Sequence, residues 1–181
     1  MTHRPRATAA LAAVAALLAG GCGAAAGSPA QGRNFNLRVV RNPDTRVSLA
    51  AYAGRPVIVS FFSSYCLTCM PETATLARYY RFNHRHHGDV TIIGIDPSDQ
   101  PAAALSLLNQ AGVSFPVLAD PSMTTATAFG TPGLPATFFL NARHHVVRKV
   151  LGPITLQQLT TGSNRINGTQ PAAAPSASPP G

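Results

Sequence analysis

The chain has 181 residues, enough for one domain with a buried core and flanking tails. Lysine and arginine number 14 against 6 acidic residues, so the formal net charge is +8 at pH 7. A positive charge of this size fits anionic lipid headgroups, wall polymers or acidic segments of client proteins, and by itself it does not choose among them.

Residues 1–21 have the pattern of an export signal. Two arginines precede an apolar run over residues 7–19, which is shorter than the about 20 residues that a membrane-spanning helix needs. Small residues then stand directly before Cys22. This arrangement resembles a bacterial lipoprotein signal, although Ala19 rather than Leu stands three places before the cysteine. The resemblance implies an extracytoplasmic protein held at the cell membrane by a lipid on Cys22; a plain secretory signal with an unmodified Cys22 is the alternative. Either way the domain works where disulfides persist, and nucleic acid is a poor partner.

Composition divides the rest of the chain into three parts. Residues 22–34, rich in Gly, Ala and Ser, are expected to form a flexible linker, and residues 163–181, rich in Pro, Ala and Ser, a disordered tail. Between them, residues 35–162 alternate short apolar runs with helical patterns, which predicts an α/β domain with a central sheet of mixed direction. The expected strands are 57–62, 90–95, 115–118 and an antiparallel pair at 137–140 and 146–151, with a small hairpin within 35–54. The expected helices run from about Cys66 to His84, from a cap at Ser98 or Asp99 to about Ala111, from Asp120 to near Gly130, and onward from a cap at Thr155.

One stretch joins a buried strand to a helix start and carries two cysteines. Residues 57–62 are apolar and strand-forming, and apolar residues at helical spacing follow Cys66. The unpaired N–H groups and positive dipole end of a helix start favour a thiolate, lowering the pKa of a cysteine from about 8.5 to about 3.5–7.5. Cys66 can then attack at neutral pH, and Cys69, one turn further, is close enough to form a disulfide with it. The pair predicts thiol–disulfide exchange.

Two other roles for a C-x-x-C pair are open on the sequence. Half of a zinc site would need two more Cys or His ligands at suitable spacing, and the third cysteine, Cys22, is assigned to the lipid. A purely structural disulfide across so short a loop would restrict the unfolded chain little. Because both alternatives fit poorly, redox chemistry is the favoured interpretation of the pair.

Several motifs together resemble those of a known family. They are the strand that runs into Cys66-Leu67-Thr68-Cys69, an additional unit from about Ser98 to Asp120, the stretch Gly133-Leu134-Pro135-Ala136-Thr137-Phe138-Phe139 after Phe129-Gly130, and the lipoprotein-like start. From about Val47 to Thr160 the chain resembles extracytoplasmic thioredoxin-fold proteins of the TlpA/ResA/CcmG type. The resemblance implies a thioredoxin-like fold: a central mixed β-sheet flanked by helices, with an extra αβ insertion before a cis-proline loop.

The resemblance also assigns residues to a client-binding surface. It implies that Pro135 is the cis-proline that faces the active cysteines. A cis X–Pro bond turns the chain sharply and leaves the backbone of the preceding Leu134 free to pair with a client peptide. Tyr65 stands where the family usually has Trp, and it keeps a smaller aromatic group beside Cys66.

Glu72 is the candidate for proton transfer. It matches a glutamate of ResA-like members, whereas Ser60 stands where thioredoxin has a buried Asp that assists proton transfer. Glu72 follows Cys69 by three residues and so shares its helix face. Cys69 must lose its proton before it can resolve a mixed disulfide, so we expect Glu72, its pKa raised by partial burial, to accept that proton directly or through a water. The alternative is that Glu72 only complements the helix dipole.

The expected activity is exchange in which Cys66 attacks and Cys69 resolves. No bound cofactor or metal is expected beyond the redox-active disulfide itself. The resemblance implies exported cysteine-containing clients, cytochrome c precursors among them, a membrane electron donor or acceptor, and a monomer. The Leu67-Thr68 dipeptide matches neither strongly reducing nor strongly oxidising pairs, so the direction is open, and a reductase is the direction that we expect.

Two proteins of the same fold are the alternatives. Sco-type copper chaperones bind copper with two cysteines and a distant His, a role open to His144-His145, but their cysteines are spaced C-x-x-x-C. Peroxiredoxins, which reduce peroxides, have a counterpart of Ser63 three residues before the reactive cysteine. The proline that they carry seven residues before that cysteine is Val59 here.

Basic side chains gather toward the end of the first expected helix. They are Arg78, Arg81, His84, Arg85, His86 and His87. Positive charge there complements the negative end of a helix dipole, so a solvated face is expected, with a weak transition-metal site as the alternative.

Overall fold

The computed structural model describes residues 34–85, 91–97 and 100–168, and the structural statements below refer to them. Among these residues no helix is long and apolar enough to cross a membrane. Several sequence-based predictions fall outside the described residues: the export signal, Cys22, nearly all of the linker, His86, His87, Ser98, Asp99 and residues 169–181 of the tail.

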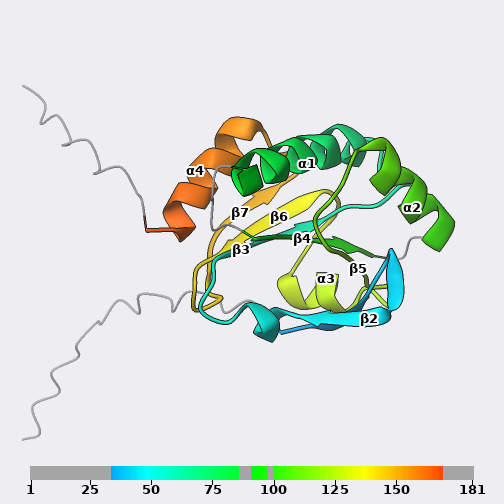
Figure 1. The fold of residues 1–181 in the computed structure, drawn as a ribbon, viewed down its shortest axis with the longest axis horizontal. Coiled ribbons are helices and arrows are strands. Elements are labelled where there is room, and N and C mark those ends of the chain that lie inside the picture. The colour runs from blue at the N-terminus through cyan, green and yellow to red at the C-terminus, as the bar shows by residue number, and fades with distance from the viewer. Residues whose placement is uncertain (1–33, 86–90, 98–99, 169–181) are drawn as a thin grey trace, which may run out of the picture.

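The described fold is a seven-stranded sheet with helices on both faces (Figure 1). The strand order is β2-β1-β5-β4-β3-β6-β7. The strands are β1 (Asn36–Val39), β2 (Asn42–Ser48), β3 (Val57–Phe61), β4 (Thr91–Asp96), β5 (Val117–Ala119), β6 (Ala136–Leu140) and β7 (Val146–Leu151). The helices are α1 (Cys69–Arg85), α2 (Pro101–Gln110), α3 (Thr124–Phe129) and α4 (Leu156–Ile166), with a 3-10 turn at Leu49–Tyr52. Because β3, β4 and β5 are parallel and the other pairings antiparallel, the predicted mixed α/β sheet is confirmed.

β3 lies inside the sheet and is buried along its whole length. Successive side chains of a strand point to opposite faces. Val57, Val59 and Phe61 therefore enter the core on the α3 side, and Ile58 enters the core under α1, α2 and α4. Figure 1 shows α1, α2 and α4 on one face of the sheet and α3 on the other. This double burial accounts for the continuous apolar run that predicted the strand.

α2 and β5 form the expected αβ insertion before the cis-proline loop. β5 continues the parallel set beside β4, and its other edge pairs with β1 of the predicted N-terminal hairpin. The prediction of a cap at Ser98 or Asp99 is wrong, because the N-cap residue is Gln100 and its side chain makes no capping hydrogen bond. Pro101 instead starts α2. Proline fits this position because a backbone N–H at the start of a helix has no intrahelical partner, so its absence costs no hydrogen bond.

α1 begins at Cys69 and not near Cys66 as predicted. Residues 66–69 form a turn in which the Cys69 N–H donates to the Cys66 carbonyl oxygen at 3.0 Å. Pro71 consequently falls in the first helical turn, where backbone N–H groups have no intrahelical partner, so it removes no helix hydrogen bond. Cys66 precedes the positive end of the α1 dipole, and Cys69 lies within it.

Two further element boundaries differ from the sequence predictions. α3 starts at Thr124, because Asp120 lies outside the helix and its side chain accepts from the N–H groups of Thr125 and Ala126 at 2.9 and 3.0 Å. α4 does follow the predicted cap at Thr155, which forms a capping box with Gln158. The helix extends to Ile166, past the expected domain end at residue 162, because its last turn is still buried against the core.

Candidate active site

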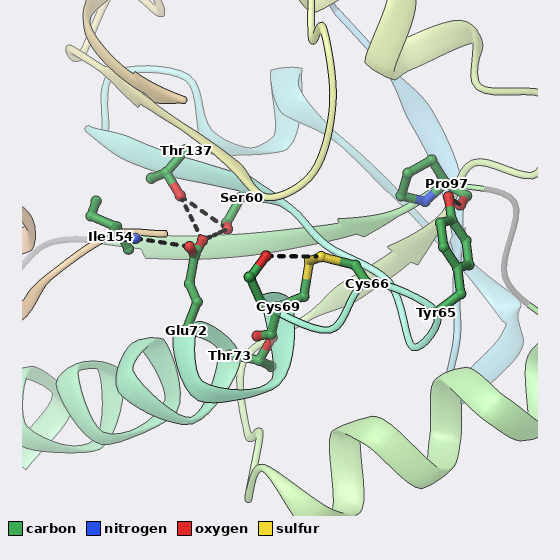
Figure 2. The surroundings of a disulfide bond; sticks show 10 residues. Ser60, Tyr65, Cys66, Cys69, Glu72, Thr73, Pro97, Thr137 and Ile154 are labelled. Atoms are coloured by element: carbon green, nitrogen blue, oxygen red, sulfur yellow. Dashed lines mark hydrogen bonds between the residues drawn. A yellow bond between two sulfur atoms is a disulfide. The ribbon is translucent and has the colours of Figure 1, made fainter. Parts of the chain in front are cut away.

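The two cysteines of the C-x-x-C pair are joined by a disulfide at the entrance to α1 (Figure 2). Their Cα atoms are 5.3 Å apart. Cys66 is partly exposed, whereas Cys69 is completely buried. Leu67 between them is 95% exposed, so this turn protrudes from the surface. A partner molecule can therefore reach the Cys66 sulfur, while the Cys69 sulfur is shielded behind it.

Thr68 places a hydroxyl next to the accessible sulfur. Its Oγ1 atom lies 3.6 Å from Cys66 Sγ, within hydrogen-bonding range for sulfur. A hydroxyl at that place can donate to a Cys66 thiolate once the disulfide is reduced. From the sequence, Thr68 was considered only as part of the Leu67-Thr68 dipeptide, and its contact with Cys66 was not expected.

The cis-proline implied by the family resemblance is present. The peptide bond between Leu134 and Pro135 is cis, and the Pro135 carbonyl oxygen accepts from the Gly152 N–H at 2.9 Å. Pro135 directly precedes β6, whose first residue pairs with Phe61 at the end of β3. The cis bond therefore lies at the same edge of the sheet from which the chain enters the cysteine turn.

Tyr65 and Leu134 both lie at this edge. The Tyr65 ring is exposed, and its hydroxyl donates to the carbonyl oxygen of Pro97, after β4, at 3.3 Å. Figure 2 shows the ring directed toward Pro97. Leu134 is half-buried, and it packs against the same core cluster as Cys66. With the protruding Leu67, these side chains give the cysteine turn an apolar rim.

Glu72 is buried behind the disulfide, with 2% of its surface exposed. Its Oε1 atom accepts from the hydroxyls of Ser60 at 3.4 Å and Thr137 at 3.3 Å, and Oε2 accepts from the Ile154 N–H at 2.9 Å (Figure 2). The two hydroxyls are themselves 3.1 Å apart. They meet because Ser60 on β3 and Thr137 on β6 are direct partners in the antiparallel register.

Burial raises the pKa of Glu72 from 4.5 to about 7, because the ionised carboxylate loses its water. The hydrogen bonds from Ile154, Thr137 and Ser60 act in the opposite direction and limit the rise in this pKa. The expected rise is thus present, and burial is its main cause. Near neutral pH the carboxyl group is divided between its protonated and ionised forms, the condition in which it can both accept and return a proton.

The sequence analysis did not identify the partners of Glu72. It treated Ser60 only as the loss of a thioredoxin Asp, and it gave no role to Thr137 or to the Ile154 N–H. The pairing of the two hydroxyls depends on the register between β3 and β6, which follows from neither strand alone. Only the register of β3 against β6, which was not predicted from the sequence, could have pointed to Thr137.

The histidines do not form a metal centre in the described part of the chain, where no group of three His, Cys, Asp or Glu side chains could hold a metal ion. His144 lies in the β6–β7 turn with a positive φ of 57°, and its Nε2 atom is 3.1 Å from the carbonyl oxygen of Tyr52. That contact joins the turn to the 3-10 segment.

Comparison with known proteins shows which family this chain is similar to. Residues 29–149 match the model of the AhpC/TSA family. The chain belongs to the AhpC/TSA family. Among curated members of similar sequence, the thiol-disulfide oxidoreductase ResA of Bacillus subtilis (strain 168) is 29% identical over 110 residues, which are 61% of this chain and 60% of that protein. The thiol:disulfide interchange protein DsbE of Allochromatium vinosum is 31% identical over 124 residues, 68% of this chain and 66% of that protein.

This chain is also similar in fold to solved structures. One is a secreted Mycobacterium tuberculosis disulfide oxidoreductase described as homologous to E. coli DsbE, with a TM-score of 0.64 and 20% identity over 72% of this chain and 95% of that one. These findings confirm the thioredoxin-like fold and the resemblance to ResA-type proteins. The sequence matches cover about three fifths to two thirds of the lengths of the curated relatives.

Proposed function

We propose that this chain is a thiol–disulfide oxidoreductase that exchanges the Cys66–Cys69 disulfide with cysteine pairs of exported proteins. The observation that carries the proposal is the disulfide itself, with one sulfur accessible and the other buried beside a carboxyl group of raised pKa. The names of the ResA and DsbE relatives support the same class of reaction.

In the reducing direction, the Cys66 thiolate attacks one sulfur of a client disulfide. The client S–S bond breaks, and the attacked client sulfur becomes bonded to Cys66 Sγ. The other client sulfur leaves as a thiolate that takes a proton from water. Cys69 then gives up its proton and attacks Cys66 Sγ. The mixed disulfide breaks, the Cys66–Cys69 disulfide forms, and the second client thiol is released. The client has gained two electrons and this chain has lost two.

Glu72 is assigned to the resolving step. Cys69 is the first residue of α1 and Glu72 the fourth, so both side chains lie on one face of the helix, and Cys69 is too buried to give its proton directly to bulk water. The hydroxyls of Ser60 and Thr137 suit a group that changes protonation state, because a hydroxyl can donate to a carboxylate and accept from a carboxylic acid. The Ile154 N–H holds the other oxygen in either state.

The rim around Cys66 is assigned to client binding. The cis bond before Pro135 leaves the Leu134 backbone available to pair with an extended client segment beside the cysteine turn. Tyr65 and the exposed Leu67 supply apolar contacts next to the attacked sulfur. Pro135 also has no N–H of its own, so it presents no competing donor there.

We place this activity outside the cytoplasm, at a membrane to which a lipid on Cys22 attaches the chain, and in a monomer. The clients that fit are exported proteins with cysteine pairs, apocytochrome c among them. A membrane electron donor would restore the dithiol in a reductase. These assignments rest on the lipoprotein-like start and on the family resemblance.

The test of the activity is two-electron transfer to a peptide that contains one disulfide. The reduced full chain is mixed with the peptide, and mass spectrometry follows the peptide disulfide and the Cys66–Cys69 disulfide together. We expect one peptide disulfide to disappear for each Cys66–Cys69 disulfide formed, and no transfer by the Cys66→Ser variant. A reduction potential near −270 mV would support a reductase and one near −120 mV an oxidase. Absence of exchange in both directions would refute the proposed function.

A further inference from the structure

A groove of about 560 Å³ lies between α1 and α4, and the exchange chemistry does not use it. The two helices are joined at its base by a buried hydrogen bond from the Tyr79 hydroxyl to Ser163 Oγ at 2.7 Å. The walls of the groove are thus held in place by the core. Tyr79 belongs to the lining, and Ser163 lies in the buried face of α4.

One wall of the groove is cationic. Arg78, Arg81 and Arg85 all line it, at spacings that keep them on one side of α1. Their hydrogen bonds go to neutral groups: Arg78 to Thr75 Oγ1 at 3.2 Å, Arg81 to the carbonyl oxygen of Gly112, and Arg85 to the carbonyl oxygen of Arg81 at 3.2 Å. None of the described lining residues is acidic, so within the groove this charge has no carboxylate to neutralise it.

Two large apolar side chains protrude beside the arginines. Phe82 of α1 is 60% exposed and Leu156 of α4 is 57% exposed, and both line the groove. Exposed apolar groups flanked by arginines are typical of a surface that lies in a membrane interface, where the cations meet lipid phosphates and the apolar groups enter the acyl boundary. From the sequence, these arginines were expected to form a solvated helix end, with a weak transition-metal site as the alternative.

We propose that the α1–α4 groove docks on the surface of a membrane that contains anionic phospholipids. Arg78, Arg81 and Arg85 bind the headgroup phosphates, and Phe82 and Leu156 enter the acyl boundary. A peptide helix is the less suitable occupant, because polar residues, Thr75 and Thr160 among them, separate the apolar ones and would leave the apolar face of such a helix without a continuous partner.

The groove extends along much of α1. Phe82 lies 13 residues after Cys69, which is about 20 Å at the rise of an α-helix. Leu156 lies nearer the cysteine end, because it closely follows Ile154, whose N–H donates to Glu72. The cysteine turn itself leads into α1 and does not line the groove. The proposal is independent of the exchange chemistry and of a lipid on Cys22.

The test uses the absence of tryptophan from the chain. In the Phe82→Trp variant of the full chain, the one indole reports on the groove alone, whatever other segment contacts the lipid. With vesicles of phosphatidylglycerol and phosphatidylcholine we expect a blue shift of its emission and protection from an aqueous quencher. With vesicles of phosphatidylcholine alone we expect neither change. The control is Met123→Trp, which places an indole at a half-exposed position before α3, on the opposite face of the sheet (Figure 1); its emission should not shift.

Charge removal in the Phe82→Trp background tests the role of the arginines. Each basic side chain near an anionic surface strengthens binding about fivefold, so adding Arg78→Gln with Arg85→Gln should raise the lipid concentration for half of the emission shift about 25-fold. The matched control, Arg38→Gln with Arg143→Gln, removes the same charge from exposed positions elsewhere and should change that concentration about twofold at most.

Three results would each overturn the proposal. The first is an indole in the groove that does not respond to anionic vesicles. The second is an equal response from the indole of the Met123→Trp control. The third is an equal weakening of the response by the two pairs of arginine substitutions.

Discussion

Replacing Glu72 by glutamine tests the assigned proton transfer. Glutamine keeps the shape of the side chain, and its amide oxygen can accept from the Ile154 N–H while its NH₂ group donates to the hydroxyls of Ser60 and Thr137. The buried network therefore stays satisfied, and the variant loses only a group that can accept a proton. The disulfide should still form, and the fold should be retained.

We expect Glu72→Gln to slow resolution of the mixed disulfide at least tenfold, since positioned general bases typically contribute more than that. First attack by Cys66 should change much less, because its sulfur is exposed to water. The wild-type resolution rate should rise with pH through an inflection near 7, where Glu72 ionises, and the variant should lack this inflection. Rapid acid quenching followed by mass spectrometry measures both steps, as formation and decay of the mixed disulfide with a model peptide.

The same substitution has a predictable effect on stability. The pKa of Glu72 is about 7 in the folded chain against 4.5 for the free group, so between these pH values the folded state holds a proton that the unfolded state has lost. The stability that this group contributes is therefore present below pH 4.5 and is lost as the pH rises through 7, by about 3 kcal/mol in all. Denaturant unfolding should show this difference. Between pH 4 and pH 8, the free energy of unfolding of the wild type should fall by about 3 kcal/mol relative to that of Glu72→Gln.

A second buried carboxylate provides the control. Asp120 caps α3 and is remote in the chain from the cysteines, so Asp120→Asn should alter stability and leave both exchange rates unchanged. If Glu72→Gln also keeps both rates and the pH inflection, and changes only stability, then Glu72 is a structural helix residue and the proton-transfer assignment is wrong.

Three other predictions each concern a single residue. Thr137→Val removes a hydroxyl that favours ionised Glu72 without opening a cavity, so the inflection in the pH profile of resolution should move to higher pH; an unmoved inflection would show that this hydroxyl does not tune Glu72. Gly162→Ala would place a Cβ atom in steric overlap with the buried Phe139 ring, so chemical denaturation should show a loss of about 1–3 kcal/mol, and an unchanged midpoint would contradict the close packing of α4 on β6. If Cys22 is lipidated, globomycin should cause a slower-migrating precursor to accumulate in the producing cells, and an unchanged, freely soluble product would rule the lipid out.

Local sequence patterns predicted the elements that position the cysteines. β3 was recognisable because it is buried on both faces, whereas the cis bond before Pro135 was implied by the family resemblance. The start of α1 was misplaced by three residues, because the 66–69 turn has the same residue spacing as a helical turn. The end of α4 was misplaced because its polar last turn buries only a few side chains, Ile166 among them.

The surroundings of Glu72 and the α1–α4 groove were beyond local patterns for a different reason. Ser60 and Thr137 are 77 residues apart and meet only through strand register. Ile154 reaches Glu72 across 82 residues, from the loop that leads into α4. The groove likewise needs the first and the last α-helix of the described fold, α1 and α4. Such contacts depend on how the elements pack together, which no window of sequence contains.

Trapping of a mixed disulfide tests the central claim most directly. Full-length Cys69→Ser and Cys66→Ser variants are each reduced and mixed with a peptide that contains a disulfide, and products are separated without reductant and identified by mass spectrometry. With Cys66 as the attacking thiol and Cys69 as the resolving one, Cys69→Ser should accumulate a covalent adduct through Cys66, and Cys66→Ser should form none. An adduct that forms only through Cys69, or no adduct with either variant, would contradict the claim.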